Sequence, residues 1–560
     1  MTNGRKLRIL LIDSPYTNII KGACPPGEPI LAESNHPIGL LYTGTYAQKK
    51  LKEEIDLKIL GFKPSEKNYI RITHEVVRDF KPDIVGITTY TFTLYDAYQI
   101  AKAVKTENPK IKLVAGGVNT SIYPEEMIKQ EFIDAIFMGD GEEIFAEFIK
   151  NFNTQDMYSV NGTWIKKDKE IIKNHPAPPI LDLDKIPFPD RNLMINKEIY
   201  QESYIFPGYR KTELVSSRGC PYSCSYCQSS GKKYRVRSPT NVVDEMEYLL
   251  GEGYNFFQFW DDTFNIQIKR VKEICKEIIR RNLQKKIRYR IRIVANIADE
   301  EMFRLLKESG CEMVYIGVES GDNHILESVN RKIKVEHCKE AIRLAKKYGL
   351  SVMGYFMIGF PGETKNHIKK TLDFMLKNSF DFMETTILVP MPTTPIYKRA
   401  IEEGKMDDWY RRYTLSPWKN AWYKYYETTI KAEELYKIQK QIYFRFYFRP
   451  SYIIRLALKS RDKNSFMKRF NIGIRLLRWI FSQDYPKNKL ECELNESGDY
   501  AEIHTHNGIS SNDSSVSFSS NSEQVSTYQK NSAEDFRKQE SRPQIKLSVK
   551  FPLKLLKFFL

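Results

Sequence analysis

The stretch Ser216–Ser230 reads SSRGCPYSCSYCQSS and carries Cys220, Cys224 and Cys227 in a C-x3-C-x2-C spacing. Three thiolates on one Gly-, Pro- and Ser-bearing loop can bind a shared inorganic centre. No fourth Cys or His lies within about twenty residues on either side, so a closed zinc site is not expected. Three thiolates leave one iron of a cubane cluster open to an external molecule. The alternatives are a zinc knuckle that lacks a ligand and a chance cluster of cysteines.

The spacing, with the aromatic Tyr226 just before the third cysteine, resembles the signature of the radical S-adenosylmethionine (SAM) enzymes. The resemblance implies a [4Fe-4S] cluster held by the three cysteines, with SAM chelated at the open iron. It also implies that one electron cleaves SAM to a 5'-deoxyadenosyl radical. A flavodoxin or ferredoxin is the electron donor we expect.

At 560 residues, the chain is long enough for three or four domains. Its eight cysteines include only one tight cluster, which is typical of a reducing compartment rather than of a disulfide framework. The segment MTNGRKLRILLIDSP runs straight into a strand-like stretch, so we expect no signal peptide. No apolar run approaches the roughly eighteen residues that span a bilayer. We therefore expect a cytoplasmic protein.

Residues 6–152 alternate apolar runs with helical periods and predict five β-α units. Short loops between them indicate an α/β fold with a doubly wound, flavodoxin-like sheet that binds ligands beyond the carboxyl ends of its strands. The segment has no G-x-G-x-x-G after the first strand and no P-loop, which argues against a dinucleotide or ATP site. The candidate ligand contacts at the predicted strand ends are Asp13, Thr88, Thr89, Gly116, Gly117 and Gly139.

This segment resembles a cobalamin-binding domain in HPIGLLYTGTYA, PDIVGIT, LVAGGVNTSIYPEE and the GDGEE run. The resemblance implies that the strand-end residues contact cobalamin. Domains that ligate cobalt use D-x-H-x-x-G in the first loop, but Pro15 occupies the histidine position here, and Asn119 stands where many relatives have a His. We therefore expect cobalamin without a histidine beneath the cobalt. A domain that has lost the cofactor is the alternative.

Residues 153–205 are rich in proline around HPAPPILDLDKIPFPDR and predict a connector. Residues 206–430 contain six further β-α units, which predict a partial, TIM-type (β/α)6 radical SAM core with its site at the carboxyl ends of the strands. Asp261 and Asp262 end the second strand of this core and can orient SAM or substrate. Ordinary loop polarity is the alternative for these strand-end residues.

Further motifs of the core match positions that contact SAM in radical SAM enzymes. Glu319 and Ser320 end VYIGVES, where relatives contact the ribose, and Arg331 matches a basic position that pairs with the SAM carboxylate. GFPGET resembles the G-x-P-G-E-T turn that passes near the adenine. The SAM-binding residues implied by the resemblance are Tyr226, Glu319, Ser320, Arg331, Gly359 and Pro361. The sequence does not identify the residues that act on the substrate.

Residues 431–490 carry fifteen Lys and Arg against four Asp and Glu, an excess of +11 within the chain's net charge of +17. Such basic, amphipathic segments can lie on an anionic membrane or grip an acidic substrate, and packing on the core is the alternative. The aromatic residues that suit membrane docking are Tyr443, Phe444, Phe446, Tyr447, Phe448, Trp479 and Phe481. Peripheral contact at the inner membrane face is therefore one expectation, and nucleic-acid binding is not expected. Residues 491–560 turn polar and predict a disordered tail.

The cobalamin domain, radical SAM core and basic extension together resemble a branch that includes anaerobic magnesium-protoporphyrin cyclase-like and hopanoid-biosynthesis enzymes. The resemblance implies a cobalamin-dependent radical SAM enzyme with a small-molecule or lipid-like substrate. The expected reaction is methylation of an unactivated carbon in a lipid, tetrapyrrole or secondary metabolite. The alternatives are cyclisation or oxidoreduction without methyl transfer, and a non-catalytic cobalamin or cluster sensor. A sensor needs no SAM pocket, so the SAM motifs argue against it.

Overall fold

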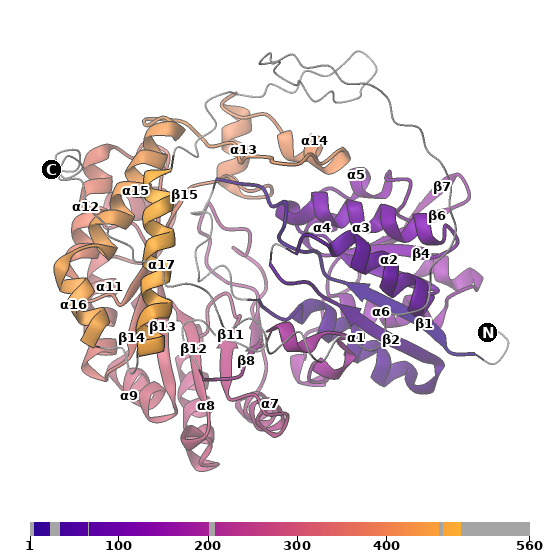
Figure 1. Ribbon diagram of the computed structural model, residues 1–560, viewed down its shortest axis with the longest axis horizontal. Helices are drawn as coiled ribbons and strands as arrows, with labels where there is room; N and C mark the ends of the chain where they lie inside the picture. Colours follow the sequence, from indigo (N-terminus) through magenta and orange to yellow (C-terminus); the bar gives the residue numbers. More distant parts are fainter. Residues whose placement is uncertain (1–4, 23–33, 65, 201–207, 459–462, 483–560) are drawn as a thin grey trace, which may run out of the picture. The chain divides into compact units, whose positions relative to one another are not determined.

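The computed structural model describes residues 5–22, 34–64, 66–200, 208–458 and 463–482 (Figure 1). These residues contain a seven-stranded sheet, a six-stranded sheet and a two-stranded ribbon. The tail predicted at 491–560 lies outside the described residues. Helices and strands are otherwise found close to where the sequence places them.

The amino-terminal sheet begins with five parallel strands in the order β2-β1-β3-β4-β5. This is the doubly wound, flavodoxin-like order that the sequence predicts. The bounds are β1 Leu7–Ile12, β2 Ile55–Leu60, β3 Ile84–Thr88, β4 Lys112–Gly116 and β5 Ala135–Phe137. The central strands are apolar runs buried on both faces, as expected where helices cover both sides of a sheet.

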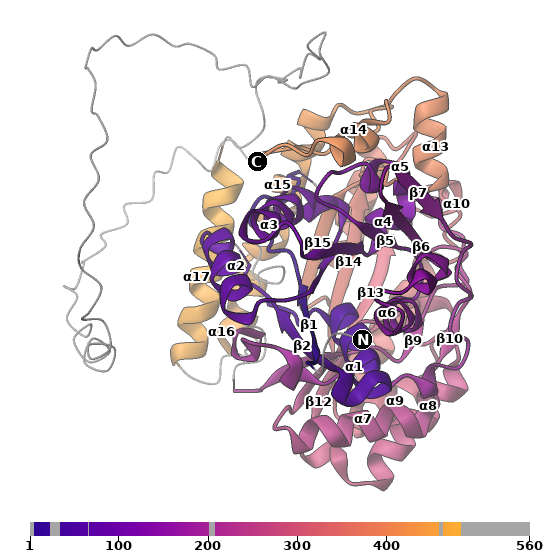
Figure 2. The ribbon, with the colours of Figure 1, turned by 90° about the vertical axis from the view of Figure 1, so that its right-hand side faces the viewer.

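Helices cover both faces of this sheet, as Figure 2 shows. They are α1 Ile38–Leu51, α2 Tyr69–Phe80, α3 Leu94–Glu107 and α6 Gly141–Lys150. Ile9 and Leu11 of β1 enter the core beneath α1 and α6, whereas Leu10 and Ile12 enter the core beneath α2 and α3. The strand order reverses between β1 and β3, so their carboxyl ends form the expected ligand-binding edge.

The segment expected to be a connector contains two strands. β6 (Thr163–Lys167) and β7 (Glu170–Lys173) form an antiparallel hairpin that extends the sheet from β5. Both are short and lysine-rich, so their alternation is hard to detect in the sequence. The Pro-rich part then reaches the opposite edge of the sheet, where the Ile195 N–H donates to the Ile59 carbonyl of β2 (2.9 Å). The connector therefore spans the first domain from edge to edge.

The core forms a six-stranded parallel sheet in the order β8-β11-β12-β13-β14-β15. The bounds are β8 Lys211–Leu214, β11 Phe256–Phe259, β12 Arg288–Ile293, β13 Cys311–Glu319, β14 Ser351–Ile358 and β15 Phe382–Ile387. Within the described part of the chain, β8 and β15 do not pair, so the barrel is open between them. This is the partial (β/α)6 barrel predicted from the sequence.

Five helices cover the outer face of the barrel sheet (Figure 1). They are α7 Pro239–Gly251, α8 Ile268–Arg280, α9 Glu300–Glu308, α11 Val335–Lys347 and α12 Lys365–Lys377. Their starts follow ordinary capping rules: Ser238 caps α7 before a proline, Asp299 caps α9 and Thr364 caps α12. These caps fix the strand-to-helix loops at the functional edge of the barrel.

The basic extension forms α15 (Ala432–Tyr447), α16 (Pro450–Leu458) and α17 (Lys463–Phe481). Helix α15 lies along β15 and provides hydrogen bonds to its edge. The Thr385 N–H donates to the Tyr443 hydroxyl (3.1 Å). The Tyr447 hydroxyl accepts from the Met383 N–H (3.0 Å) and donates to the Met383 carbonyl (2.6 Å). Side chains thus occupy an edge that could otherwise pair with another strand.

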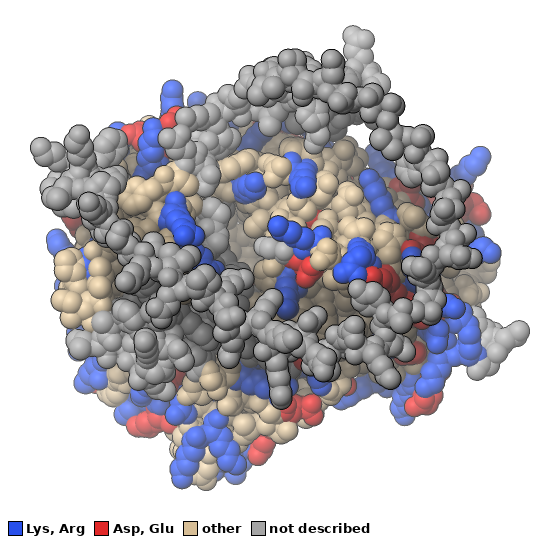
Figure 3. Space-filling view, viewed as in Figure 1, with Lys and Arg blue, Asp and Glu red and all other residues tan. Residues whose placement is uncertain are grey.

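The predicted docking of aromatic residues on a membrane is wrong for Tyr443, Phe446 and Trp479, because all three are buried. The Trp479 indole N–H donates to the Tyr436 hydroxyl (3.2 Å), which ties α17 to α15. On the face drawn in Figure 3, Lys and Arg stand in separate groups, several of them beside acidic side chains. None of the described helices is long and apolar enough to cross a bilayer. Helix α15 is therefore packed on the barrel, which is the alternative that the sequence left open, whereas Phe481 at the end of α17 is 47% exposed.

Candidate functional site

The three cysteines lie on a loop that two short strands close at the carboxyl end of the barrel. β9 (Ser217–Arg218) and β10 (Arg235–Val236) pair antiparallel at the base of this loop. Gly219 has a φ of +82°, and a Cβ there would lie 2.4 Å from the Lys233 carbonyl oxygen. Only glycine lets the two arms of the loop approach so closely.

The three thiols are near one another without surrounding a single point. Cys224 is buried, Cys220 and Cys227 are half-buried, and all three are free. Burial raises the pKa of Cys220 and Cys227, and nearby thiols add to both shifts. Among the described residues, no three Cys, His, Asp or Glu side chains meet around one metal ion, as a zinc knuckle would need. A cubane cluster binds each thiolate to a different iron, so this set of three neighbouring thiols fits it better.

Glu319 and Arg331 lie beside the cysteine loop, where β13 ends. Arg331 Nη1 lies 3.6 Å from Cys224 Sγ, and Nη2 donates to the Gly317 carbonyl (2.7 Å). Glu319 has a φ of +67°, a region that non-glycine residues rarely adopt, and the β13–β14 register shifts there. A Cβ on Gly317 would lie 2.8 Å from Glu319 Oε1 and 3.0 Å from Arg331 Nη2. This strained strand end therefore holds the carboxylate and the guanidinium close together.

The electrostatics of this pair suit the binding of a zwitterionic amino acid. Burial raises the pKa of Glu319, although Arg331 and a hydrogen bond from Tyr226 oppose the shift. Burial disfavours charge on Arg331, but Tyr226, Glu319 and Cys224 outweigh it and raise the pKa of Arg331. The Arg331 Nε is buried and donates to no described residue. A guanidinium with an unused N–H can bind the SAM carboxylate through its planar fork.

The GFPGET turn follows β14 and packs beside the cysteine loop. The ring of Phe360 meets Tyr226 edge to face, with centroids 5.6 Å apart. Glu363 Oε2 accepts from the N–H groups of Gly359 (2.6 Å) and Phe360 (3.2 Å), and burial raises the pKa of Glu363 to about 7. A Cβ on Gly359 would lie 2.8 Å from Leu435 of α15, so the extension covers this turn. The turn and Tyr226 thus form an apolar wall next to Glu319.

Other predicted SAM or substrate contacts have structural roles. The Ser320 hydroxyl is buried, lies 3.2 Å from Thr371 Oγ1 and accepts from the Asp322 N–H (3.2 Å). Asp261 is buried and accepts from the hydroxyls of the two serines that start the cysteine loop. Asp262 accepts from the Ser229 hydroxyl in the same loop (2.9 Å). The aspartates therefore anchor the loop, whereas Pro361 lines a small cavity of about 130 Å³ beside it.

Several of the residues expected to contact cobalamin, at the carboxyl ends of the first sheet's strands, form hydrogen bonds with one another. The Thr88 hydroxyl donates to Asp13 Oδ1 (2.8 Å), and burial raises the pKa of Asp13 to about 6. The N–H and hydroxyl of Thr89 both donate to the Gly116 carbonyl (2.7 and 2.9 Å). A Cβ on Gly117 would lie 2.8 Å from the Thr89 carbonyl oxygen, whereas the nearest atom to one on Gly116 would be Phe137 Cβ at 4.0 Å. Gly117 thus lets two loops touch, and Gly116 leaves an open backbone.

Asn119 stands where many related cobalamin domains have a histidine, and its side-chain amide is already hydrogen-bonded within the protein. Asn119 accepts from the Thr91 hydroxyl (2.9 Å) and donates to the Thr414 hydroxyl (3.3 Å). Gly139 has a φ of +108°, which favours glycine, and a Cβ there would touch Ile144 Cδ1 at 3.8 Å. His36 is buried, with Nδ1 2.7 Å from a Glu213 oxygen of β8. Small side chains and backbone groups thus line this edge, and His36 Nε2 is buried without a hydrogen-bond partner among the described residues.

Comparisons with known proteins agree with this arrangement. A model described as the radical SAM superfamily matches residues 214–375, and a model of the B12 binding domain matches residues 31–149. An uncharacterized methyltransferase of Pyrococcus horikoshii is 30% identical over 457 residues, which cover 80% of this chain and 94% of that protein. The chain belongs to the radical SAM enzymes that carry a B12-binding domain.

Relatives of this radical SAM enzyme are named for more than one reaction. The anaerobic magnesium-protoporphyrin IX monomethyl ester cyclase of Rubrivivax gelatinosus is 29% identical over 354 residues, covering 61% of this chain and 63% of the cyclase. The solved structure of OxsB, a cobalamin-dependent SAM radical enzyme, superposes with a TM-score of 0.60 at 16% identity. That superposition covers 85% of this chain and 72% of OxsB and shows a shared fold.

Sequence analysis missed a set of ion pairs between the two domains of the radical SAM enzyme. Arg218 of β9 pairs with Asp140 (3.3 Å) and with Glu142, and Arg235 of β10 also pairs with Asp140. We call these four residues the domain clasp. Both acids belong to the GDGEE run, which the sequence associated with cobalamin. The two arginines that bracket the cysteine loop were the available signal, but the sequence does not say which acids they meet.

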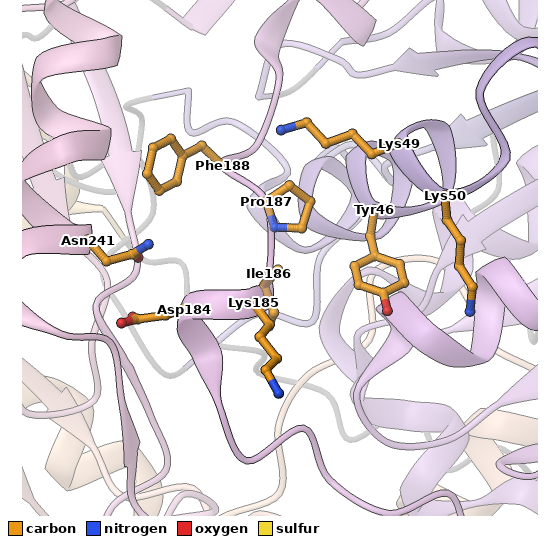
Figure 4. A pocket seen from close by; sticks show the side chains of 9 residues that line it. All are labelled: Tyr46, Lys49, Lys50, Asp184, Lys185, Ile186, Pro187, Phe188 and Asn241. Atoms are coloured by element: carbon orange, nitrogen blue, oxygen red, sulfur yellow. The ribbon is translucent and has the colours of Figure 1, made fainter.

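A surface pocket of about 620 Å³ lies away from the candidate site residues. Figure 4 shows Tyr46, Lys49 and Lys50 of α1 on one side and Phe188 and Asn241 on the other. None of the residues proposed to contact SAM, the cluster or cobalamin lines it. It therefore plays no part in the site described above.

Proposed function

We propose that this radical SAM enzyme methylates an unactivated carbon of a small-molecule or lipid-like substrate. The observation that carries the proposal is the similarity to a methyltransferase along nearly the whole length of that protein, in a chain that has both domains. Cys220, Cys224 and Cys227 would hold the [4Fe-4S] cluster. When bound, the cluster supplies the electron that cleaves SAM, and cobalamin supplies the methyl group.

The residues around the cysteine loop have separate tasks in this proposal. Arg331 binds the SAM carboxylate with its fork, and Glu319 accepts from the ribose hydroxyls. Tyr226 and the GFPGET turn exclude water from the adenine side, with α15 covering the turn. Keeping water out protects a reactive radical from side reactions. Reduced flavodoxin or ferredoxin is the proposed electron donor.

A second candidate function is radical cyclisation or oxidoreduction without methyl transfer. It is favoured by the similarity to a magnesium-protoporphyrin cyclase, which spans 61% of this chain. Both functions use the same cluster and SAM residues, so the site described here does not separate them. Methyl transfer ranks first because the methyltransferase similarity covers more of both proteins.

The fate of the SAM methyl group separates the two functions. Full-length protein, reconstituted without oxygen with iron, sulfide and cobalamin, is reduced by flavodoxin and given methyl-labelled SAM with a metabolite extract. A product that carries the whole labelled methyl group supports the methyltransferase. Formation of 5'-deoxyadenosine with an unlabelled, changed metabolite supports the cyclase or oxidoreductase. Absence of any SAM cleavage contradicts both.

A further inference from the structure

The inner face of β12 places arginines inside the barrel. Tyr289 faces the outer helices, because its hydroxyl lies 3.6 Å from Cys275 Sγ in α8. Since side chains alternate along a strand, Arg290 and Arg292 face the interior. The Arg290 guanidinium lies 5.7 Å from the centre of the Tyr315 ring, which confirms this direction. The interior therefore carries cationic side chains as well as aromatic ones.

Arg292 belongs to an aromatic layer just below the proposed SAM residues. Tyr315 is its register partner on β13, and the rings of Tyr315 and Tyr355 stack with centroids 5.6 Å apart and planes 11° apart. The Arg292 guanidinium lies close enough to Tyr355 to oppose the burial that raises the pKa of its hydroxyl. The next interior position on β13 is Gly317, followed by Glu319. Because Gly317 has no side chain, the Glu319 carboxylate and the Arg331 guanidinium lie where its Cβ would point, and Tyr355 is its register neighbour on β14.

The charge of this layer is positive. Arg292 is half-buried, and no described Asp or Glu lies within 4 Å of its nitrogens, so it forms no ion pair there. Arg288, two residues earlier, pairs with Glu312 (2.9 Å). Glu384 of β15 is a buried carboxylate close enough to Tyr355 to raise its pKa. Within this layer, the two arginines Arg290 and Arg292 face the single carboxylate of Glu384, so the layer itself has a net positive charge.

We infer that Arg292, together with Tyr315 and Tyr355, binds an acidic group of the substrate. The substrate would then be an anionic molecule, bearing a carboxylate or phosphate, whose apolar part lies against the tyrosine rings. A guanidinium fork suits either oxyanion, and the partly buried setting strengthens the contact. The inference rests on the proposed function, because only a radical formed near Glu319 makes this layer a substrate site.

Calorimetry on the full-length, reconstituted protein in the presence of SAM tests the inference. The probes are 1-naphthoate and 1-naphthyl phosphate, with neutral 1-naphthamide as the matched ligand. Wild type should bind at least one of the acids about tenfold tighter than the amide, a difference of about 1.4 kcal/mol. Arg292→Gln should abolish the preference, and Arg292→Lys should retain part of it. Arg304→Gln, which removes an exposed arginine paired with Glu308 on α9, should leave the preference unchanged.

The affinity for SAM shows whether Arg292 binds SAM or the substrate. Arg331→Gln should weaken SAM binding about tenfold or more, whereas Arg292→Gln should change it by less than about twofold. Equal losses in the two variants would assign Arg292 to SAM and overturn the inference. No preference of the wild type for either acid would overturn it as well. Failure of the proposed function is a different result, since it shows as absent SAM cleavage whatever the probes do.

Discussion

Gly317 is the residue that allows Glu319 and Arg331 to meet. Gly317→Ala should weaken SAM binding at least tenfold, because the added Cβ would lie 2.8 Å from the Glu319 carboxylate and 3.0 Å from the guanidinium. Calorimetry with SAM measures the loss, and circular dichroism confirms the fold. The matched control is Gly251→Ala, where a Cβ meets nothing within 4 Å. Unchanged SAM affinity in Gly317→Ala would show that SAM does not need this pair.

The cysteines give the most direct prediction at the residue scale. Replacing Cys220, Cys224 or Cys227 singly by Ala should remove most of the bound iron and abolish SAM cleavage, because a cluster held by two thiolates is easily lost. Iron analysis and 5'-deoxyadenosine formation are the measurements. Cys338→Ala, which changes a buried cysteine of α11, should keep its iron. Full cleavage in all three loop variants would contradict the cluster assignment.

Glu363 predicts a pH dependence of stability. Burial raises the pKa of Glu363 from 4.5 to about 7, so the folded state favours the protonated carboxyl. Its stabilising contribution is fully present below about pH 4.5 and is lost as the pH rises through about 7, on the order of 3 kcal/mol in total. Urea unfolding between pH 5 and pH 8 should show this decline. Glu363→Gln should flatten the curve, and an unchanged slope would contradict the shift.

At the scale of elements, the hydrogen bonds between α15 and the edge of β15 predict that removing either tyrosine hydroxyl destabilises the protein. Tyr443→Phe leaves the Thr385 N–H without the hydroxyl that accepts from it, which should cost about 1–3 kcal/mol. Tyr447→Phe should cost a similar amount, because the hydroxyl serves two groups of Met383. Urea unfolding gives both values. Tyr248→Phe, on the exposed side of α7, is the control and should change stability little.

Elements were predicted well where their own residues specify them. The strand ending in VYIGVES is a long, mostly apolar run between turn signals, so its position follows from the local pattern. The hairpin β6–β7 was missed because its lysines disguise the alternation. The role of α15 was left open between membrane docking and packing on the core, because aromatic and basic residues look alike whether they face lipid or a strand edge. Only the tertiary contacts of Tyr443 and Tyr447 decide between the two.

At the scale of the whole molecule, the domain clasp predicts coupling between the B12-binding domain and the cysteine loop. Arg235→Gln should speed amide exchange in residues 216–236, because β10 loses the ion pair that holds it to Asp140. Asp140→Asn should have a similar effect from the other domain. Hydrogen–deuterium exchange read by mass spectrometry measures both. Arg343→Gln, which breaks an exposed pair with Glu340, should leave the loop unchanged.

The candidate site residues were named one by one from the sequence, but their assembly was not predicted. The cysteine spacing, Glu319, Arg331 and GFPGET were recognisable because each motif is local. The clasp, the clearance at Gly317 and the Arg292 layer depend on residues far apart in the chain, and one sequence carries no record of those contacts. Asp261 shows the converse, since a polar strand end looked like a ligand but its carboxylate anchors the loop.

The cover that α15 provides for the edge of β15 also has a consequence for folding during synthesis. A ribosome releases β15 before α15, so every nascent chain passes through a stage in which the barrel is nearly complete and one strand edge is exposed. Exposed strand edges recruit other chains, and a crowded translation site offers many. Synthesis that stalls or stops before Tyr447 would therefore yield insoluble material rather than a smaller working enzyme. Heterologous expression should improve when translation is slowed by cooling or when a chaperone that shields nascent chains is co-produced.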